Sequence, residues 1–176
     1  MAKSSKKKIA NRERILQKLI HEGSMWLKNG ESKQSEAEIF AERLNYVLNI
    51  VSLWSHACMI DGELALSEEM SVSQLINYFF GGEESIFPAG KIDVDVVFGE
   101  ITETFLIPRP LDEVIDFAKE NEELAAIFYE QACCIVASDG KLRKEEREFL
   151  NRLSQKLNLP PARQHFIENK YIQNLI

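Results

Sequence analysis

The chain has 176 residues, which suits one domain or two small half-domains around a common core. Its formal charge of −7 is uneven, because residues 1–14 hold six basic residues and one acidic residue, which leaves −12 on the remainder. An acidic body argues against nucleic acid as the main partner, since phosphate binding needs a basic face. It favours cations or basic partners instead.

The start of the chain is polar and basic. Residues 1–8 contain four lysines and no apolar run follows them, so the pattern is not that of a secretory signal peptide. We expect a disordered tail, with contact to an anionic membrane surface or nucleic acid as the alternative. No apolar run approaches the roughly 18–20 residues of a membrane span. The three cysteines lack disulfide or zinc spacing, so the sequence predicts a cytoplasmic protein with no transmembrane segment.

Three helices are predicted in the first half of the chain. Apolar residues at helical spacing predict a helix over residues 9–28. A second helix, over residues 36–60, becomes apolar on most sides and should be central and buried. Ser35 and Glu38 are spaced as a capping box for its start. A third helix is predicted over residues 67–80.

The second half is predicted to be helical as well. The loop at residues 82–91 contains Ile86 and Phe87, which either dock a partner or tuck into the core. Residues 92–105 alternate like a strand but fit a helix over a longer span, and we predict the helix. Further helices are predicted at residues 111–119, 121–138 and 144–157, with a last one opened by Pro160 and Pro161. The fold class is therefore all-α, a bundle of about seven or eight helices spanning residues 9–176.

A short motif occurs twice, each time between an apolar helix and a charged one. Asp and Gly are followed by Leu three residues after the Asp and Glu seven residues after it, and the two copies are 78 residues apart. The copies consist of Asp61, Gly62, Leu64 and Glu68, and of Asp139, Gly140, Leu142 and Glu146. Two similar hairpins usually pack about a pseudo-two-fold axis, so we predict repeat halves at about residues 36–80 and 111–157.

The motif corresponds to the later half of a calcium-binding EF-hand loop, whose earlier ligand positions fall here on apolar helix. Two interpretations stay open. In one, Asp-Gly ends a helix, Leu fills the core and Glu caps the next helix, without any metal. In the other, the carboxylates hold a divalent cation, Ca²⁺, Mg²⁺, Mn²⁺ or Zn²⁺. The candidate metal ligands are Asp61, Glu68, Asp139 and Glu146.

The duplicated motif, each copy behind an apolar helix, resembles the repeated signature of the TerB family of tellurite-resistance proteins. Related domains occur beside J-domains in membrane-anchored co-chaperones. The resemblance covers residues 52–80 and 128–157. It implies an all-helical fold of two pseudo-symmetric halves in a bacterial cytoplasm, and a non-enzymatic role in metal-linked stress response. Ala65 and Leu66 depart from the pattern, because polar residues usually precede the Glu.

No nucleophile set or phosphate-binding loop is present in the sequence. His21, His56 and His165 lie far apart and are best interpreted as solvated or hydrogen-bonded. Cys133 and Cys134 suit a buried core, with a redox or thiophilic-metal site as the alternative. We therefore expect a non-enzymatic binding or scaffold module with a protein partner and a possible homodimer. The alternatives are a metal-independent, co-chaperone-type adaptor and a metal-dependent hydrolase.

Overall fold

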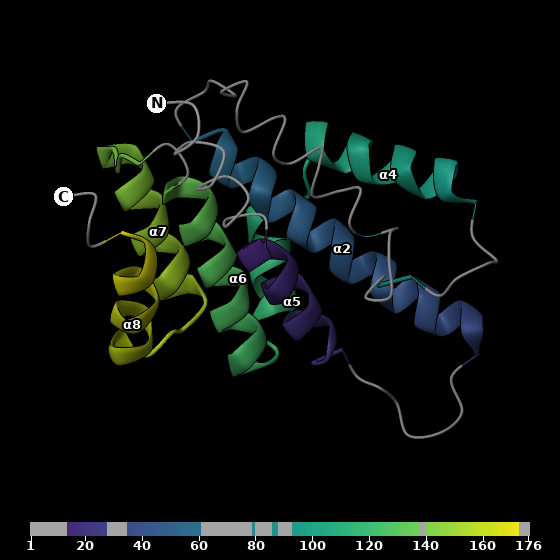
Figure 1. Ribbon diagram of the computed structural model, residues 1–176, viewed down its shortest axis with the longest axis horizontal. Helices are drawn as coiled ribbons and strands as arrows, with labels where there is room; N and C mark the ends of the chain where they lie inside the picture. Colours follow the sequence, from purple (N-terminus) through teal and green to yellow (C-terminus); the bar gives the residue numbers. More distant parts are fainter. Residues whose placement is uncertain are drawn as a thin grey trace.

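The computed structural model describes residues 14–27, 35–60, 79, 86–87, 93–137 and 140–172 (Figure 1). All regular structure within these residues is helical, which confirms the predicted all-α bundle. A helix at residues 14–24 precedes α2 (Glu36–Cys58), α4 (Val94–Leu106), α5 (Leu111–Ala118), α6 (Glu122–Val136), α7 (Lys144–Lys156) and α8 (Pro161–Tyr171). The predicted tail at residues 1–8 and most of the predicted helix at residues 67–80 lie outside the described residues.

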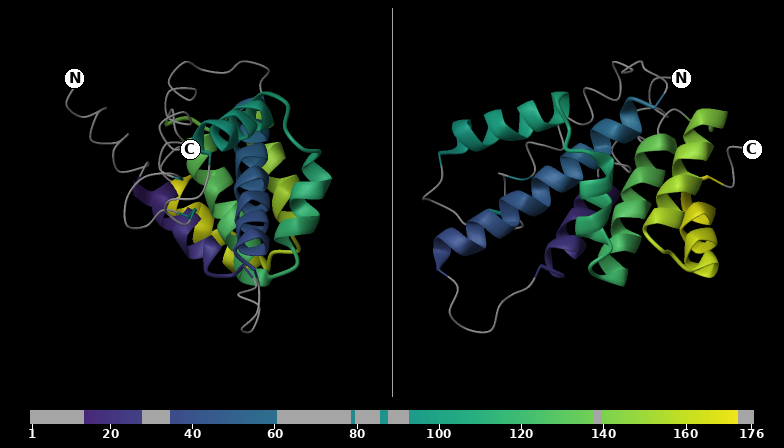
Figure 2. Two further views of the ribbon diagram at one scale, coloured as in Figure 1. Left: turned by 90° about the vertical axis from the view of Figure 1, so that its right-hand side faces the viewer. Right: turned by 180° about the vertical axis from the view of Figure 1, so that it is seen from behind.

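The bundle is arranged around α2, against which α4, α5 and α6 all pack (Figures 1 and 2). Its start is the predicted capping box, since the Glu38 amide donates to Ser35 Oγ over 3.3 Å and the Ser35 amide donates to Glu38 Oε2 over 2.7 Å. From Tyr46 to Cys58 nearly every residue is buried. Because a helix that is apolar all round must be enclosed, the other helices surround this half.

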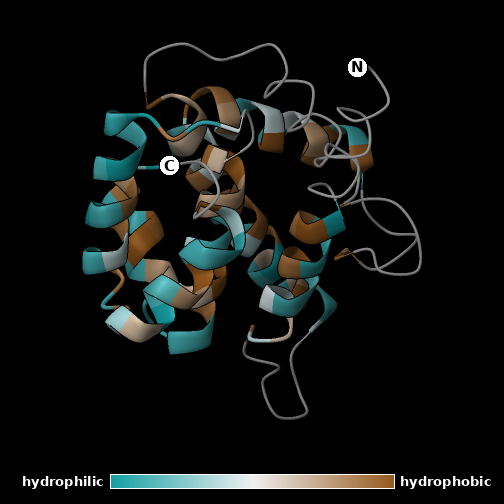
Figure 3. Cartoon of the chain, turned by 60° about the vertical axis from the view of Figure 1, so that its left-hand side comes forward, coloured by the Kyte–Doolittle hydropathy of each residue, from teal (hydrophilic) through white to brown (hydrophobic). Residues whose placement is uncertain are grey.

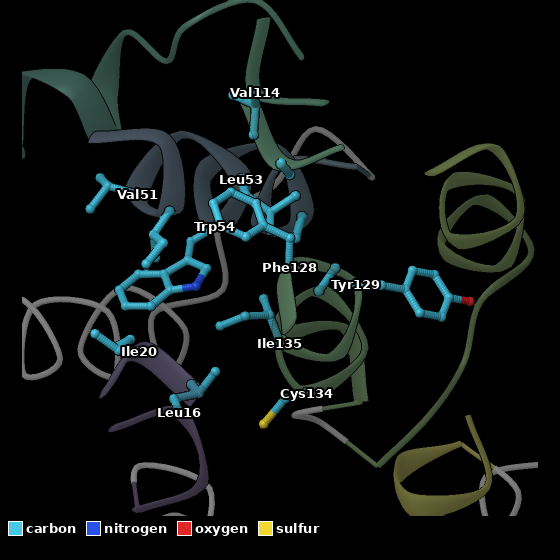
Figure 4. Close-up of a cluster of buried hydrophobic side chains, with 14 of the residues drawn as sticks. Leu16, Ile20, Val51, Leu53, Trp54, Val114, Phe128, Tyr129, Cys134 and Ile135 are labelled. Atoms are coloured by element: carbon cyan, nitrogen blue, oxygen red, sulfur yellow. The ribbon is translucent and has the colours of Figure 1, made fainter. Parts of the chain in front are cut away.

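The second central helix is α6, which packs against α2, α5, α7 and α8. The predicted inward residues are all buried: Leu124, Ile127, Phe128, Ala132, Ile135 and Val136. Trp54 of α2 donates from Nε1 to Gln131 Oε1 of α6 over 2.9 Å, inside the core where Phe128 and Ile135 also lie (Figure 4). Hydrophobic residues gather between the helices and polar ones face outward (Figure 3).

The strand-like alternation before Pro108 does not produce a strand. Residues 94–106 form α4, capped by Asp93, whose carboxylate accepts from the Val96 amide over 3.3 Å. Val97 and Ile101 are buried four residues apart, so the helical period determines which side chains reach α2. The choice of helix over strand is confirmed.

The alternatives for Ile86 and Phe87 are decided in favour of the core. The two residues are only 6% and 4% exposed, and the Phe87 ring lies 5.6 Å from the ring of Phe40. Arg43 of α2 donates from Nη1 to the Ile86 carbonyl over 2.7 Å. These two residues therefore fasten their segment to α2.

The internal repeat stays a prediction. Packing of α2 against α6 fits two duplicated hairpins, but the first motif at residues 61–68 and the charged helix after it lie outside the described residues. Within the described part of the chain, each helix is too short or too polar to cross a bilayer.

Gly23, in the helix at residues 14–24, lies directly against Tyr46 of α2. Tyr46 is fully buried and donates from Oη to the Ile20 carbonyl over 2.8 Å. A Cβ atom on Gly23 would lie 2.0 Å from Tyr46 Oη and 2.9 Å from its Cζ. The absence of a side chain at position 23 is therefore what lets the first helix reach α2.

We predict that Gly23→Ala lowers the free energy of unfolding by about 1–3 kcal/mol, because a methyl group enters a filled core. Urea denaturation measures the change. Tyr46→Phe alone should cost about 1 kcal/mol through the lost hydrogen bond. The double variant should lose less stability than the two single variants lose together, because Tyr46→Phe removes Oη, the atom closest to the new methyl group. If the two single losses simply add in the double variant, the proposed contact between position 23 and Tyr46 Oη is contradicted.

Candidate functional site

The second motif forms the turn between α6 and α7. Its Gly140 has a φ angle of +79°, a conformation that glycine adopts without steric cost, and its amide donates to the Ala137 carbonyl over 3.2 Å. Leu142 is partly buried against the core. Gly140 therefore turns the chain after α6 has ended at Val136, and Leu142 packs against the core, as the metal-free interpretation predicts for that leucine.

Glu146 lies in the first turn of α7 and is only 6% exposed. Its Oε2 accepts from the Arg143 backbone amide over 2.6 Å, so the carboxylate caps the start of α7. The Arg143 guanidinium lies 3.6 Å from Oε1. Both contacts place positive charge or a donor beside the carboxylate, and the helix dipole favours a negative charge there.

The other three predicted ligands, Asp61, Glu68 and Asp139, lie outside the described residues. Whether the four carboxylates come together therefore stays a prediction. No group of three or more His, Cys, Asp or Glu side chains placed to hold a metal ion occurs among the residues that are described.

The capping role of Glu146 predicts that Glu146→Ala lowers the free energy of unfolding by about 1–2 kcal/mol, because the Arg143 amide loses its acceptor near the protein interior. Glu145→Ala is the matched control, since Glu145 is exposed in the same helical turn. It should change stability by less than about 0.5 kcal/mol. Chemical denaturation of both variants measures the difference, and equal losses would rule out a specific cap.

A line of polar residues on α2 was missed by the sequence analysis. Asn45, Ser52 and His56 all contact Arg109, in the turn between α4 and α5. Ser52 Oγ accepts from the Arg109 amide over 3.1 Å, and Asn45 Oδ1 accepts from its Nη1 over 2.6 Å. His56 Nε2 lies 2.8 Å from the Arg109 carbonyl, and because a carbonyl only accepts, this nitrogen is the protonated one. His56 is thus hydrogen-bonded, as expected.

Two carboxylates fasten α8 to α6. Glu168 Oε1 accepts from Tyr129 Oη over 2.6 Å and from Gln164 Nε2 over 2.8 Å. Glu130 Oε1 accepts from Lys170 Nζ over 2.9 Å and from Tyr171 Oη over 2.7 Å. Burial, followed by the neighbouring acidic groups, raises the pKa of both tyrosines well above their usual range. These hydroxyls therefore stay protonated and act as donors.

The two neighbouring cysteines lie in the core of the same helix. Cys133 and Cys134 are 0% and 3% exposed. Burial raises the pKa of the Cys133 thiol well above its usual value. Since the thiolate is the reactive species, Cys133 is better explained as a small core residue than as a redox centre.

The most exposed apolar side chains on any one described helix are those of α4 and the residue after it. Val96 is 64% exposed, and Leu106 and Ile107 are each 73% exposed. We define the outer face of α4 as Val96, Gly99, Glu103 and Leu106, which lie opposite the buried Val97 and Ile101. Because α4 packs chiefly on α2 at the edge of the bundle, this face points away from the core (Figures 1 and 2).

Comparison of the chain with protein-family models, curated proteins and solved structures finds no match in any of the three. The resemblance to TerB proteins therefore rests on the duplicated motif alone.

Proposed function

We propose that this chain is a non-enzymatic binding module that docks a protein partner on the outer face of α4. The observation that supports it is the exposure of Val96 and Leu106 at 64% and 73%, on a helix whose other side is buried. Exposed apolar side chains grouped on one element are typical of interaction sites. A cytoplasmic, TerB-like role in bacterial stress or metal resistance belongs to the same proposal and rests on the motif resemblance.

The structural role of three carboxylates also favours a scaffold over a hydrolase. Glu146 caps α7, while Glu130 and Glu168 hold α8 through tyrosine hydroxyls. Each of these carboxylates accepts a hydrogen bond that fixes a helix. A general base needs a carboxylate that faces substrate with a suitable pKa, which is a different arrangement.

The test of the binding function is site-specific photo-crosslinking in the native host. We predict that a photoreactive amino acid at Leu106 forms a discrete adduct with another protein, because this side chain is the most exposed apolar one on the proposed docking face. Phe166 of α8 is the matched control position, an exposed apolar residue at 56% on a different helix. Val96→Asp should remove the Leu106 adduct. Identical adducts from both positions, or none from Leu106, would contradict the proposal.

A divalent cation bound by Asp139 and Glu146 is a second candidate function. One observation favours it: the Glu146 carboxylate is 6% exposed and follows the turn at Gly140. Carboxylate oxygens of this kind are the ligands that Ca²⁺ and Mg²⁺ prefer in proteins.

This candidate predicts that Ca²⁺, Mg²⁺, Mn²⁺ or Zn²⁺ raises the thermal unfolding midpoint of chelator-stripped protein. A ligand that binds only the native state stabilises it by about 2.7 kcal/mol at a hundredfold excess over its dissociation constant. Glu146→Ala should abolish the rise, whereas Glu145→Ala should keep it. No rise with any of the four ions at millimolar concentration would leave the motif as a helix terminator and cap.

A further inference from the structure

We propose that the partner docked on α4 is a cationic amphipathic helix that crosses α4 at Gly99. The inference rests on the proposed function and names the chemistry of the partner. Three features of α4 lead to it: a glycine in the helix interior, apolar residues on both sides of that glycine, and acidic residues around them.

Gly99 is in the interior of α4, where no close contact with the described residues requires a glycine. A Cβ atom built on it would meet nothing within 4 Å, and its φ angle is not positive. Glycine in a helix interior lowers the folding equilibrium constant about fivefold relative to alanine. A glycine that the fold does not require, on the outward side of a helix, is suited to the close approach of another backbone.

Apolar side chains lie on both sides of Gly99 along the outer face. Val96 is three residues before it and Leu106 seven residues after it. Leu106 lies ten residues after Val96, a rise of about 15 Å along the helix, which exceeds the roughly 10 Å diameter of a helix. A helix lying across Gly99 would therefore have an apolar contact on each side, as amphipathic helices do when they dock through apolar anchor residues.

The charged residues around this face indicate that the partner helix is positively charged. Asp93, Asp95, Glu100 and Glu103 are all exposed, and no lysine or arginine occurs between residues 93 and 107. Lysine or arginine on the docking helix would complement these carboxylates. The same charge disfavours a second copy of α4, because like charges would face each other across the contact.

The experiment uses a display library of helical peptides with acidic, basic and apolar residues at randomised positions, selected against the full chain. We expect the enriched peptides to have a net positive charge and one apolar face. Their affinity should fall at least about tenfold in Leu106→Asp, whereas Phe166→Asp is the control that leaves it unchanged. Affinity should also fall in Glu100→Lys/Glu103→Lys but not in Glu120→Lys/Glu148→Lys, which changes the net charge equally at exposed residues elsewhere.

Gly99→Ala is the most specific variant, because it should act in opposite directions on folding and on binding. Its unfolding equilibrium constant should fall about fivefold, since alanine is the better helix former and has open space. Peptide affinity should nevertheless fall about tenfold, because the methyl group would hold the two backbones apart. Increased stability with unchanged binding would overturn the crossing at Gly99.

The remaining outcomes separate this inference from the proposed function. Enrichment of neutral or acidic peptides that still need Leu106 would overturn the cationic partner while keeping α4 as a docking face. Absence of any Leu106-dependent peptide would overturn both. Displacement of a selected peptide by an equal concentration of synthetic residues 1–13 would assign the face to the chain's own basic segment. Concentration-dependent self-association lost in Leu106→Asp would assign it to a second copy, and either result overturns a separate partner.

Discussion

The second half of α2 is buried on nearly every side, and this constraint determines the rest of the structure. From Tyr46 to Cys58 the helix has no face that can be left in water, so it needs neighbours all round. The helices α4, α5 and α6 supply three of them, and the helix at residues 14–24 reaches α2 where Gly23 meets Tyr46. The loop residues Ile86 and Phe87 contact the first half of α2, at Arg43 and Phe40.

Enclosing α2 also requires that each polar group on it find a partner, because an unpaired buried donor costs about 1–3 kcal/mol. Trp54 Nε1 is satisfied by Gln131 of α6. Ser52 and His56 are satisfied by the backbone of Arg109, which positions the turn where α4 gives way to α5. Apolar contacts alone do not fix how the helices are oriented. These hydrogen bonds do, because they hold the turn between α4 and α5 at a defined place on α2.

The sequence predicts most helices correctly because their signals are local. Capping by Ser35, the helical period of Val97 and Ile101, and the left-handed turn at Gly140 each depend on only a few neighbouring residues. The Arg109 contacts could not be predicted, since Asn45 and Arg109 are 64 residues apart. The spacing of Asn45, Ser52 and His56 on an apolar helix was the available signal. Of the candidate site, the cap at Glu146 was one of the two interpretations that the sequence left open, and whether a cation joins it depends on atoms outside the described residues.

The outer face of α4 combines exposed apolar side chains with a glycine in the helix interior. The named carboxylates at α7 and α8 are bound to donors of this chain, and the apolar residues of α6 are buried. On α4, by contrast, Val96 and Leu106 are exposed beside a glycine that weakens the helix. The exposed apolar side chains lower the solubility of an isolated chain, and the glycine lowers its stability. Natural sequences retain such features mainly where function requires them. This surface is unfavourable in the unbound chain and complementary to a basic helix, as is expected of a surface selected for binding.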